Sequence, residues 1–325
     1  MDFKFKSLIE VVKYFKDEKT CYDFLESQIW FEGKAACPHC GSLHVYTRAN
    51  RSKNPAKQGV REYKCAEKGC NKNFTATVGT IFESSKLPLQ TWFCAIWLCT
   101  TSSKGISSAN LAKQLNITQK SAWFVLSRIR EMFAQTSPDM LNGMVEVDET
   151  YIGGKEKNKS KSKRAANKQN AKNRYDKAID TKAPVLGLLQ RDGKVILKSM
   201  VAADKATLLP ILEQHISKDA TVVTDGLAAY RKLGNVYKQH VYVSHQNDEW
   251  VKGEFHTNTI EGFWSTLKRG IIGVYHFTSV KHLQRYCDEY SYRYNNRDSS
   301  SVEKFRKAIE SVVKARITYQ TLTGK

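Results

Sequence analysis

Apolar residues recur at helical spacing in both outer parts of the chain and follow strand-like patterns in its middle. Residues 1–36 contain LIEVVKYF and CYDFLESQIW, in which apolar positions lie three or four residues apart. The same spacing returns from about residue 88 to 135 and again after about residue 245. From Gly143 to about residue 245, the pattern alternates or forms short apolar runs, which are typical of strands. We therefore predict a mixed α/β protein.

The strand-rich region has a definite order of predicted elements. GMVEVDETYIGGK alternates as one strand, and APVLGLLQRDGKVILKSMV predicts a hairpin of two strands about an Asp-Gly turn. TLLPILEQHI is helical, whereas ATVVTDG and HVYVSH predict two further strands, with Gly226 opening an element between them. The last helix contains HTNTIEGFWSTLKRG. The expected order is three strands, helix, strand, helix, strand and helix.

Four of the eight cysteines form two close pairs, C-x2-C and C-x4-C, with a spacer of 24 residues between the pairs. Four thiolates in two pairs match tetrahedral zinc and leave no open coordination position for catalysis. The strand-like FTATVGTIF after the second pair is typical of a zinc ribbon. The predicted ligands of one structural Zn²⁺ are Cys37, Cys40, Cys65 and Cys70. His39 and His44 are alternative ligands.

The other four cysteines are predicted to be buried free thiols. Cys94 and Cys99 lie five residues apart in TWFCAIWLCTT, so a helix turns their side chains to different faces. Cys21 and Cys287 lie in other helical segments. The charged N-terminal segment is unlike a secretion signal, and the longest apolar stretch, WFCAIWLC, is too short to cross a bilayer. We therefore expect a soluble, cytoplasmic protein without disulfides.

GISSANLAKQLNITQKSAWFVLSRIREMF predicts two helices joined by a short turn. Leu111, Ala112 and Leu115 give the first helix its apolar face, and Thr118 is a predicted N-cap of the second. This is the spacing of a helix-turn-helix, which binds DNA through its second helix. The residues expected to be exposed there and to bind DNA are Gln119, Lys120, Arg128 and Arg130. A helical hairpin that contacts no DNA is the alternative.

The composition favours an anionic partner. The 325 residues include 52 Lys and Arg against 32 Asp and Glu, a formal net charge of +20, which indicates nucleic acid. Ten of these cations lie in residues 155–177, a segment too polar to form a core and predicted to be a loop. We expect the loop to contact the DNA backbone through Lys161, Lys163 and Arg164. A solvated insertion without such contacts is the alternative.

Acidic residues occur at unusual positions in two predicted strands. In the first strand Asp148 follows the alternation of Glu146 and Thr150, although aspartate is depleted in strands and is costly to bury without a partner. Glu149 is expected to point to the opposite face and is interpreted as structural. Asp225 ends the later strand ATVVTDG. The strands thus carry two aspartates that a purely structural role does not explain.

A carboxylate and an ammonium share one face of the last helix. Glu261 and Lys268 lie seven residues apart, which is two helical turns. Direct pairing on a helix favours spacings of three or four residues, so this alignment adds little stability. The apolar stripe of the same helix consists of Ile260, Phe263, Trp264 and Leu267.

Together these segments resemble the DDE transposases of bacterial insertion sequences, specifically the group related to Merlin elements. The resemblance extends over about residues 20–297 and includes CPHCGS, TATVGTIFESSKLPLQTWFCAIWL, SAWFVLSRIR, VEVDETYIGGK, VVTDG, HTNTIEGFWSTLKRGIIGVYH and HLQRYCDEYSYRYNNR. In that family the Asp of D-E-T, the Asp of T-D-G and the Glu of N-x-x-E form an acidic triad, and a Lys follows seven residues later. The resemblance assigns these catalytic roles to Asp148, Asp225, Glu261 and Lys268.

The resemblance implies a transposase that binds the terminal inverted repeats of its element, cuts the DNA ends and joins the 3′-hydroxyls to target DNA. Three converging carboxylates require cations, and oxygen ligands favour two Mg²⁺ or Mn²⁺ ions. Lys268 and Arg269 would then contact DNA phosphates. A homodimer or higher oligomer, acting on DNA in a bacterial cytoplasm, is also implied. The alternatives are a non-catalytic DNA-binding regulator and a structure-specific nuclease on the same fold.

The same resemblance implies a domain order. A small zinc ribbon and a helix-turn-helix precede a ribonuclease-H-like α/β domain with a mixed five-stranded sheet and flanking helices. The expected boundaries are 1–36 for an N-terminal helical segment, 37–84 for the zinc ribbon, 85–137 for the helix-turn-helix region, 140–300 for the catalytic domain and 301–325 for a C-terminal helical tail.

Overall fold

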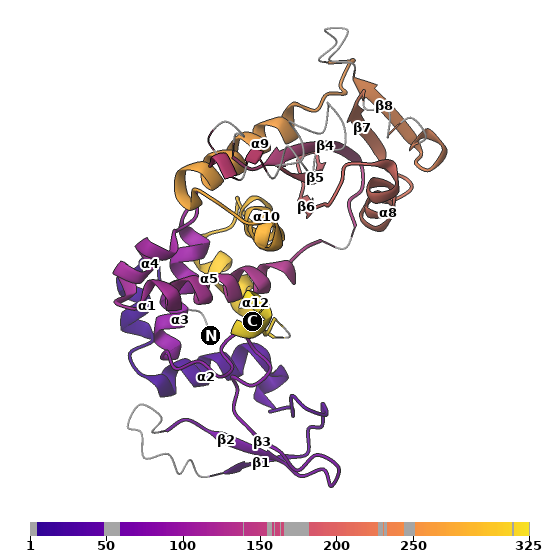
Figure 1. Cartoon of the computed structure of the whole chain (residues 1–325). Coiled ribbons are helices and arrows are strands. Elements are labelled where there is room, and N and C mark those ends of the chain that lie inside the picture. The colour runs from indigo at the N-terminus through magenta and orange to yellow at the C-terminus, as the bar shows by residue number, and fades with distance from the viewer. Residues whose placement is uncertain are drawn as a thin grey trace. The chain divides into compact units, whose positions relative to one another are not determined.

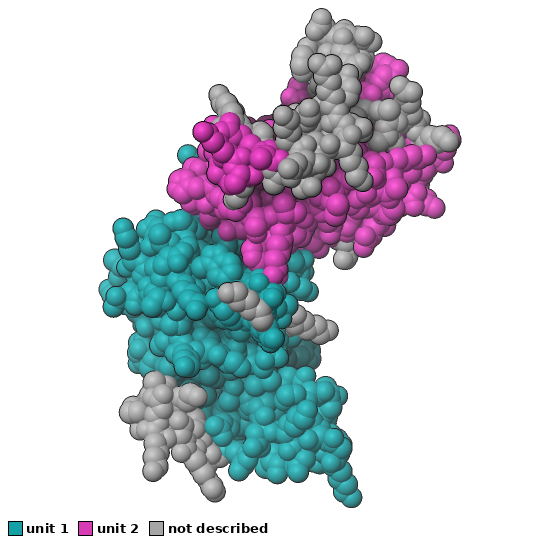
Figure 2. All heavy atoms as spheres, viewed as in Figure 1, with its two compact units in different colours: residues 1–136, 298–325 teal, residues 137–297 magenta. Residues whose placement is uncertain are grey.

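The chain forms two compact units, which Figure 2 shows in different colours. Unit 1 comprises residues 1–136 and 298–325, and unit 2 comprises residues 137–297. A computed structural model describes residues 5–48, 59–138, 140–154, 158, 160–162, 164–165, 182–226, 230, 233–243, 251–313 and 315–324. Within these ranges, no helix is long and apolar enough to cross a membrane.

Unit 1 consists of helices around a cluster of aromatic rings, together with a small sheet (Figure 1). The ring of Phe305 is fully buried and lies 5.5 Å from that of Phe5 and 6.1 Å from those of Phe93 and Trp97. The segment after residue 297, expected as a tail, therefore completes the core of unit 1. The helices of unit 1 are α1 (Leu8–Tyr14), α2 (Glu18–Ile29), α3 (Leu89–Thr101), α4 (Ser108–Leu115), α5 (Gln119–Ala134), α11 (Ser301–Glu310) and α12 (Tyr319–Thr323).

The small sheet of unit 1 carries the predicted zinc ligands. Its strands are antiparallel in the order β1-β2-β3, with bounds Val45–Arg48, Glu62–Cys65 and Asn73–Phe74. Tyr63 and Phe74 stack beneath Trp30, whose ring centroid lies 4.9 Å from that of Tyr63. This apolar cluster is small for a core, so a metal bound by the cysteines would stabilise the sheet.

Helices α4 and α5 have the predicted helix-turn-helix connection. Helix α4 ends at Asn116, whose φ of 50° is left-handed, a conformation that asparagine adopts more readily than most residues. Thr118 is the N-cap of α5, because its hydroxyl oxygen accepts the backbone N–H of Ser121 at 3.1 Å. The buried residues of both helices include the predicted apolar positions Leu111, Ala112, Ala122, Val125, Leu126 and Ile129.

The exposure predicted for two arginines of α5 is wrong. Arg128 and Arg130 are only 3% and 2% exposed. The guanidinium of Arg128 donates to the carbonyl oxygens of Ile81, Glu83 and Ile317 at 2.6, 2.8 and 3.0 Å. Segments distant in sequence therefore cover this side of α5, which the local pattern could not indicate. Both side chains serve the packing of unit 1 and are unavailable to DNA.

Unit 2 contains the mixed five-stranded sheet that the sequence predicted. Strands β4, β5 and β6 form an antiparallel meander, whereas β7 and β8 run parallel to β4. The spatial order is β6-β5-β4-β7-β8. This order places β4, the strand of Asp148, at the centre. The bounds are Met144–Ile152 for β4, Ala183–Gln190 for β5, Val195–Ser199 for β6, Thr221–Asp225 for β7 and Gln239–Val243 for β8.

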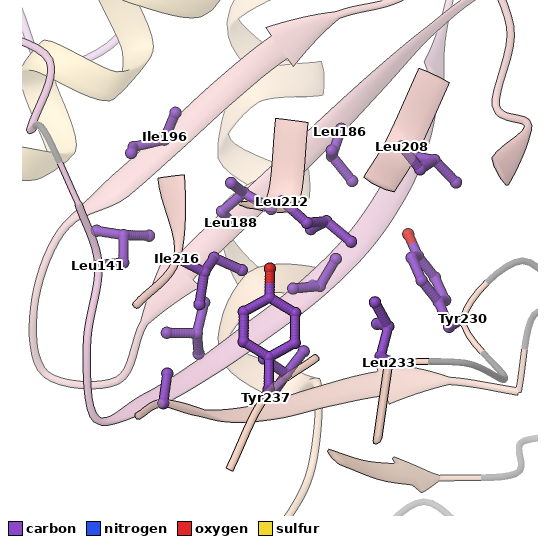
Figure 3. Packing of buried hydrophobic residues seen from close by; sticks show 14 of the residues in the cluster. Leu141, Leu186, Leu188, Ile196, Leu208, Leu212, Ile216, Tyr230, Leu233 and Tyr237 are labelled. Carbon is purple, nitrogen blue, oxygen red and sulfur yellow. The ribbon is translucent and has the colours of Figure 1, made fainter. Parts of the chain in front are cut away.

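Helices cover both faces of this sheet. Helix α8 (Lys205–His215) packs on one face, where Leu208 and Leu212 meet Leu186 and Leu188 of β5 (Figure 3). The other face contacts α9 (Asn258–Gly270), the π-helical segment η7 (Ile271–Tyr275) and α10 (Val280–Asn295). Because apolar side chains of β5 point to both faces, the strand is buried on each side. This rigid three-layer packing supports the acidic residues of β4 and β7.

Candidate active site and zinc centre

Two of the predicted acidic residues meet inside the sheet, on the neighbouring strands β4 and β7. Val147 of β4 pairs with Thr224 of β7, so the next residues, Asp148 and Asp225, are neighbours on parallel strands. Glu149 joins them, and one carboxylate oxygen from each of Asp148, Glu149 and Asp225 lies within 4.8 Å of the other two. The structure thus brings three carboxylates together, of which the sequence singled out two.

Glu149 is the member of this group that sequence reasoning assigned to a structural role. Strand alternation sends its side chain to the face opposite that of Asp148. However, the pairing of β4 with β7 ends at Val147, and Asp225 is the last residue of β7. At such an open strand edge, the side chain of Glu149 can reach the same point as Asp148. One of its oxygens, Oε1, is buried without a hydrogen-bond partner among the described residues.

Burial disfavours ionisation of the carboxylates. Burial, with further contributions from the negative charges of Asp225 and Glu261, raises the pKa of Asp148 to about 6, although an N–H from Trp264 opposes this. Burial and the charges of Asp225 and Asp148 raise the pKa of Glu149 to about 8. Three acids held this way repel one another in the ionised state. A divalent cation with oxygen ligands would relieve that repulsion, so the residues fit Mg²⁺ or Mn²⁺.

The raised pKa of Glu149 predicts a pH-dependent stability when no divalent cation is present. Unfolding returns the carboxyl to its ordinary pKa, so between about pH 4.5 and 8 the folded state binds more protons and loses stability as pH rises. Glu149→Gln removes this loss. In EDTA, we expect the free energy of unfolding of the variant, relative to that of wild type, to rise by ~2 kcal/mol between pH 5 and pH 8. The difference between the two melting temperatures should rise by ~4–8 °C over the same range. Calorimetry at each pH measures the two melting temperatures. A difference between wild type and variant that does not change with pH would contradict the raised pKa of Glu149.

Helix α9 contacts Asp148 through a tryptophan. Trp264 donates its indole N–H to Oδ2 of Asp148 at 2.8 Å. The ring lies against Gly187, the residue of β5 that pairs with Asp148. A Cβ at that glycine would lie 2.5 Å from the ring and 2.8 Å from a methyl of Ile260. The absence of a side chain at Gly187 therefore lets α9 approach the sheet closely enough to hold Asp148.

A carboxylate from the sheet caps the first turn of α9. Glu146 of β4 is fully buried, and its Oε2 accepts the backbone N–H groups of Thr259 and Ile260, each at 3.0 Å. The N-cap residue itself, Thr257, makes no side-chain cap; its hydroxyl donates to Oε1 of Glu261 at 3.2 Å. A carboxylate at a helix N-terminus satisfies unpaired N–H groups and interacts favourably with the helix dipole. Glu146 thereby fixes the turn that carries Glu261.

Arg191, from the turn between β5 and β6, completes this arrangement. It donates to Oε1 of Glu146 through two nitrogens, at 2.8 and 3.2 Å. It also donates to the carbonyl oxygens of Glu254 and His256, at 2.6 and 3.1 Å, in the segment that leads into α9. Such a forked pair compensates the buried charge of Glu146. We call Glu146 and Arg191 together the α9 clamp.

The remaining predicted catalytic residues lie on the exposed side of α9. Glu261 is exposed in the first turn and is not in the group within 4.8 Å, although its charge contributes to the raised pKa of Asp148. Lys268 is exposed two turns later and lines a cavity of about 720 Å³. Trp264 lies between them in sequence and contacts Asp148. The face of α9 that carries Glu261 and Lys268 thus borders the carboxylates.

The four predicted zinc ligands converge in unit 1. The sulfurs of Cys37 and Cys70 lie 3.7 Å apart, and those of Cys40 and Cys65 lie 3.6 Å apart. A tetrahedral zinc with bonds of ~2.3 Å requires sulfur separations of about 3.8 Å. All four sulfurs lie within 4.8 Å of one another. This arrangement fits one structural Zn²⁺, whereas Cys21, Cys94, Cys99 and Cys287 are buried free thiols, as predicted.

Loss of zinc is expected to unfold the ribbon, since zinc supplies ~10–16 kcal/mol in such small domains. Cys65→Ser should reduce bound zinc from one ion per chain to below about one tenth, as measured by mass spectrometry of the metal, and should make residues 37–74 sensitive to protease. Cys94→Ser, which changes a buried thiol of α3, is the matched control and should retain the metal. Full zinc in Cys65→Ser would remove that cysteine from the ligand set.

The structure describes only some of the surface residues that were predicted to bind DNA. Gln119 and Lys120 are exposed in the first turn of α5, and Arg269 is exposed on α9. Lys161 and Arg164 are also exposed. Lys163 and most of the predicted basic loop, 155–177, lie outside the described residues. All of the described basic residues in this set are therefore accessible to a ligand.

The class of protein is defined by a mixed α/β unit with a five-stranded sheet and a group of acidic residues on β4 and β7, in one chain with a small sheet that carries four clustered cysteines. Comparison with known families agrees with this class. Residues 140–295 match the ISXO2-like transposase domain, and residues 16–73 match the transposase zinc-ribbon domain. The chain thus contains an ISXO2-like transposase domain, which lies in unit 2, and a transposase zinc ribbon, which lies in unit 1, and a transposase domain implies DNA as a partner.

Two curated relatives extend this comparison. A protein of Halobacterium salinarum, described as an uncharacterized protein in transposable element ISH50, is 26% identical over 269 residues, which cover 79% of this chain and 84% of the relative. An uncharacterized transposase-like protein of Haemophilus influenzae is 28% identical over 96 residues, which cover 30% of this chain and 76% of the relative. The first similarity extends over most of both chains.

Proposed function

We propose that this protein is a DDE transposase that binds the terminal inverted repeats of its element, cleaves the DNA ends by metal-dependent hydrolysis and joins the 3′-hydroxyls to target DNA. The observation that carries this proposal is the meeting of Asp148 and Asp225, from strands far apart in sequence, on neighbouring strands of the sheet. Buried carboxylates without a cation destabilise a fold, so their retention in a group favours a metal site.

In this proposal Asp148 and Asp225 hold the metal ions, and Glu261 completes the ligand set from α9. Two bound Mg²⁺ or Mn²⁺ ions would supply an activated water and stabilisation of the leaving oxygen. Trp264 restrains Asp148 through its indole N–H. Lys268 contacts a DNA phosphate beside the carboxylates, since it lies two turns from Glu261 on one face of α9. Glu149 is close enough to take part in holding the ions.

We further propose that α5 reads the inverted repeat with Gln119 and Lys120. They lie in the first turn of the second helix of a helix-turn-helix, which is the part that contacts base edges in such motifs. Lys161, Lys163, Arg164 and Arg269 are proposed to contact phosphates, which position the DNA without reading its sequence. Because both ends of an element are joined to one target, a homodimer or higher oligomer is proposed as the active form.

The test is incubation of the full-length protein with Mg²⁺ and DNA that includes both flanks of its own gene. We expect nicks with 3′-hydroxyls at both element ends and products in which those ends are joined to target DNA. Nicks without any joined product would indicate a nuclease instead of a transposase. Specific binding without nicks would indicate a DNA-binding regulator.

A further inference from the structure

A cavity of about 720 Å³ lies in unit 2 between the end of β4 and the end of α9, within the size range of ~300–1,000 Å³ that is usual for ligand sites. Its lining comes from the end of β4, the start of β5, and α9 with the segment that follows it. We name it the lysine pocket, and the lining residues that matter here are Tyr151, Ile152, Lys182, Lys268, Ile272 and Phe277. Lys268 is shared with the proposed catalytic set.

The chemistry of this lining is cationic and aromatic at once. Lys182 and Lys268 supply two ammonium groups, and among the described lining residues there is no carboxylate to neutralise them. The ring of Phe277 is 73% exposed, and the neighbouring Ile272 is 70% exposed. Large apolar side chains held open to solvent beside cations are typical of surfaces on which an unpaired base stacks while its phosphate is neutralised.

The backbone around this pocket is also unusual. After α9 the chain continues as the π-helical segment η7, a rare form that is frequent at functional sites. The segment ends at His276, whose φ of 61° is left-handed and unfavourable for a residue with a side chain. This sharp end directs the chain so that Phe277 follows immediately beside the pocket. Strained backbone residues cluster at functional sites, so the strain at His276 indicates that the exposed ring of Phe277 next to it has a function.

We infer that the lysine pocket binds one unpaired nucleotide of the DNA strand next to the cut site, with its base on Phe277 and its phosphate against Lys182 and Lys268. The inference rests on the proposed function. Glu261 and Lys268 are seven residues apart, so Lys268, which lines the pocket, lies about 10 Å from Glu261 along α9. This spacing is about three steps of helical DNA at 3.4 Å each. Opening the duplex there exposes the scissile strand to the metal-binding group.

A second copy of this chain is the other class of occupant for such a surface. Lysines are depleted at interfaces between proteins, and two of them without a carboxylate among the described lining residues fit a phosphate better than a protein. The test below separates the two occupants.

The experiment uses the full-length protein, a 15-nucleotide oligothymidylate and a fully paired duplex of the same length, without divalent cations. Phe277→Ala should weaken binding of the single strand by roughly 5- to 150-fold, the range for loss of one base–aromatic stack, and should leave duplex binding within about twofold. Phe277→Tyr should restore binding. Val280→Ala is the matched control, because Val280 is 67% exposed nearby but does not line the pocket.

A crosslink locates the contact. With 5-iodouracil in the single strand, irradiation should link the DNA to the peptide that contains Phe277. Equal binding by wild type and Phe277→Ala, or links only elsewhere, would overturn the inference. A change of oligomeric state in Phe277→Ala with unchanged DNA binding would assign the surface to a second copy instead. If flanking DNA is not cut but single-strand binding depends on Phe277, the proposed reaction fails and the pocket assignment stands.

Discussion

Replacing Asp148 by Asn is expected to lower the rate of DNA cleavage by at least ~10³-fold, which is ~4 kcal/mol of transition-state stabilisation. Asparagine keeps an oxygen that accepts the indole N–H of Trp264, so the contact with α9 survives while the metal loses a charged ligand. Binding of the same DNA should be unchanged or tighter, because one negative charge is removed from a site that faces phosphates. Gel analysis of nicked products and fluorescence anisotropy measure the two effects separately.

Asp192→Asn is the matched control for this experiment. Asp192 is an exposed acid of the same unit, in the turn between β5 and β6, and its φ of 55° suits asparagine as well as aspartate. Both its cleavage and its binding should equal those of wild type. Cleavage by Asp148→Asn at the wild-type rate would show that the carboxylate group is not the active site.

Breaking the α9 clamp is expected to have the second-largest effect. Glu146→Gln leaves Arg191 partly buried without its anionic partner and weakens the cap on Thr259 and Ile260. Loss of one member of a buried ion pair lowers the free energy of unfolding by ~3–5 kcal/mol. We expect the first turn of α9, which Glu146 caps, to fray. We expect unfolding to become easier by about that amount and cleavage of saturating DNA to fall by ~10–100-fold, because Glu261 loses its position.

A second ion pair, in which the acid is buried and the arginine is half exposed, distinguishes positioning from general instability. Glu26 in unit 1 is 5% exposed and pairs with Arg61 at 2.8 Å. Glu26→Gln should lower the stability of unit 1, yet below its unfolding temperature it should cleave bound DNA at a rate within about threefold of wild type. Raising the Mg²⁺ concentration should partly rescue Glu146→Gln and not affect the control. If both variants lose cleavage equally, the clamp has no special relation to the site.

Periodicity and spacing carried much of the information about this fold. The alternation of β4 and the apolar run of β5 predicted those strands, and the two cysteine pairs predicted the sulfur cluster, because each signal lies within a short stretch of chain. The mixed five-stranded sheet was expected from the family resemblance. The pairing of Asp148 with Asp225 was expected from a family resemblance. The local pattern alone gave only two aspartates at unusual strand positions.

The residues that sequence reasoning missed depend on contacts between distant segments. Arg128 and Arg130 have the charge of surface residues, but carbonyl oxygens from residues 81, 83 and 317 satisfy the guanidinium of Arg128. Glu149 reaches the carboxylates because a neighbouring strand ends early. Glu146 caps a helix more than a hundred residues away. Such contacts could have been indicated only by covariation between distant positions, for example an acid and an arginine that vary together.

The return of residues 298–325 to unit 1 has a consequence for biosynthesis. The nascent polypeptide emerges with its N-terminal helices lacking Phe305, whose ring belongs among Phe5, Phe93 and Trp97. The whole of unit 2 is synthesised before that ring. The strands that carry Asp148 and Asp225 are thus free to pair early in translation, whereas the helical unit is complete only after residues 298–325 have emerged. A newly made molecule would then bring these two carboxylates together before the core of its helical unit is closed.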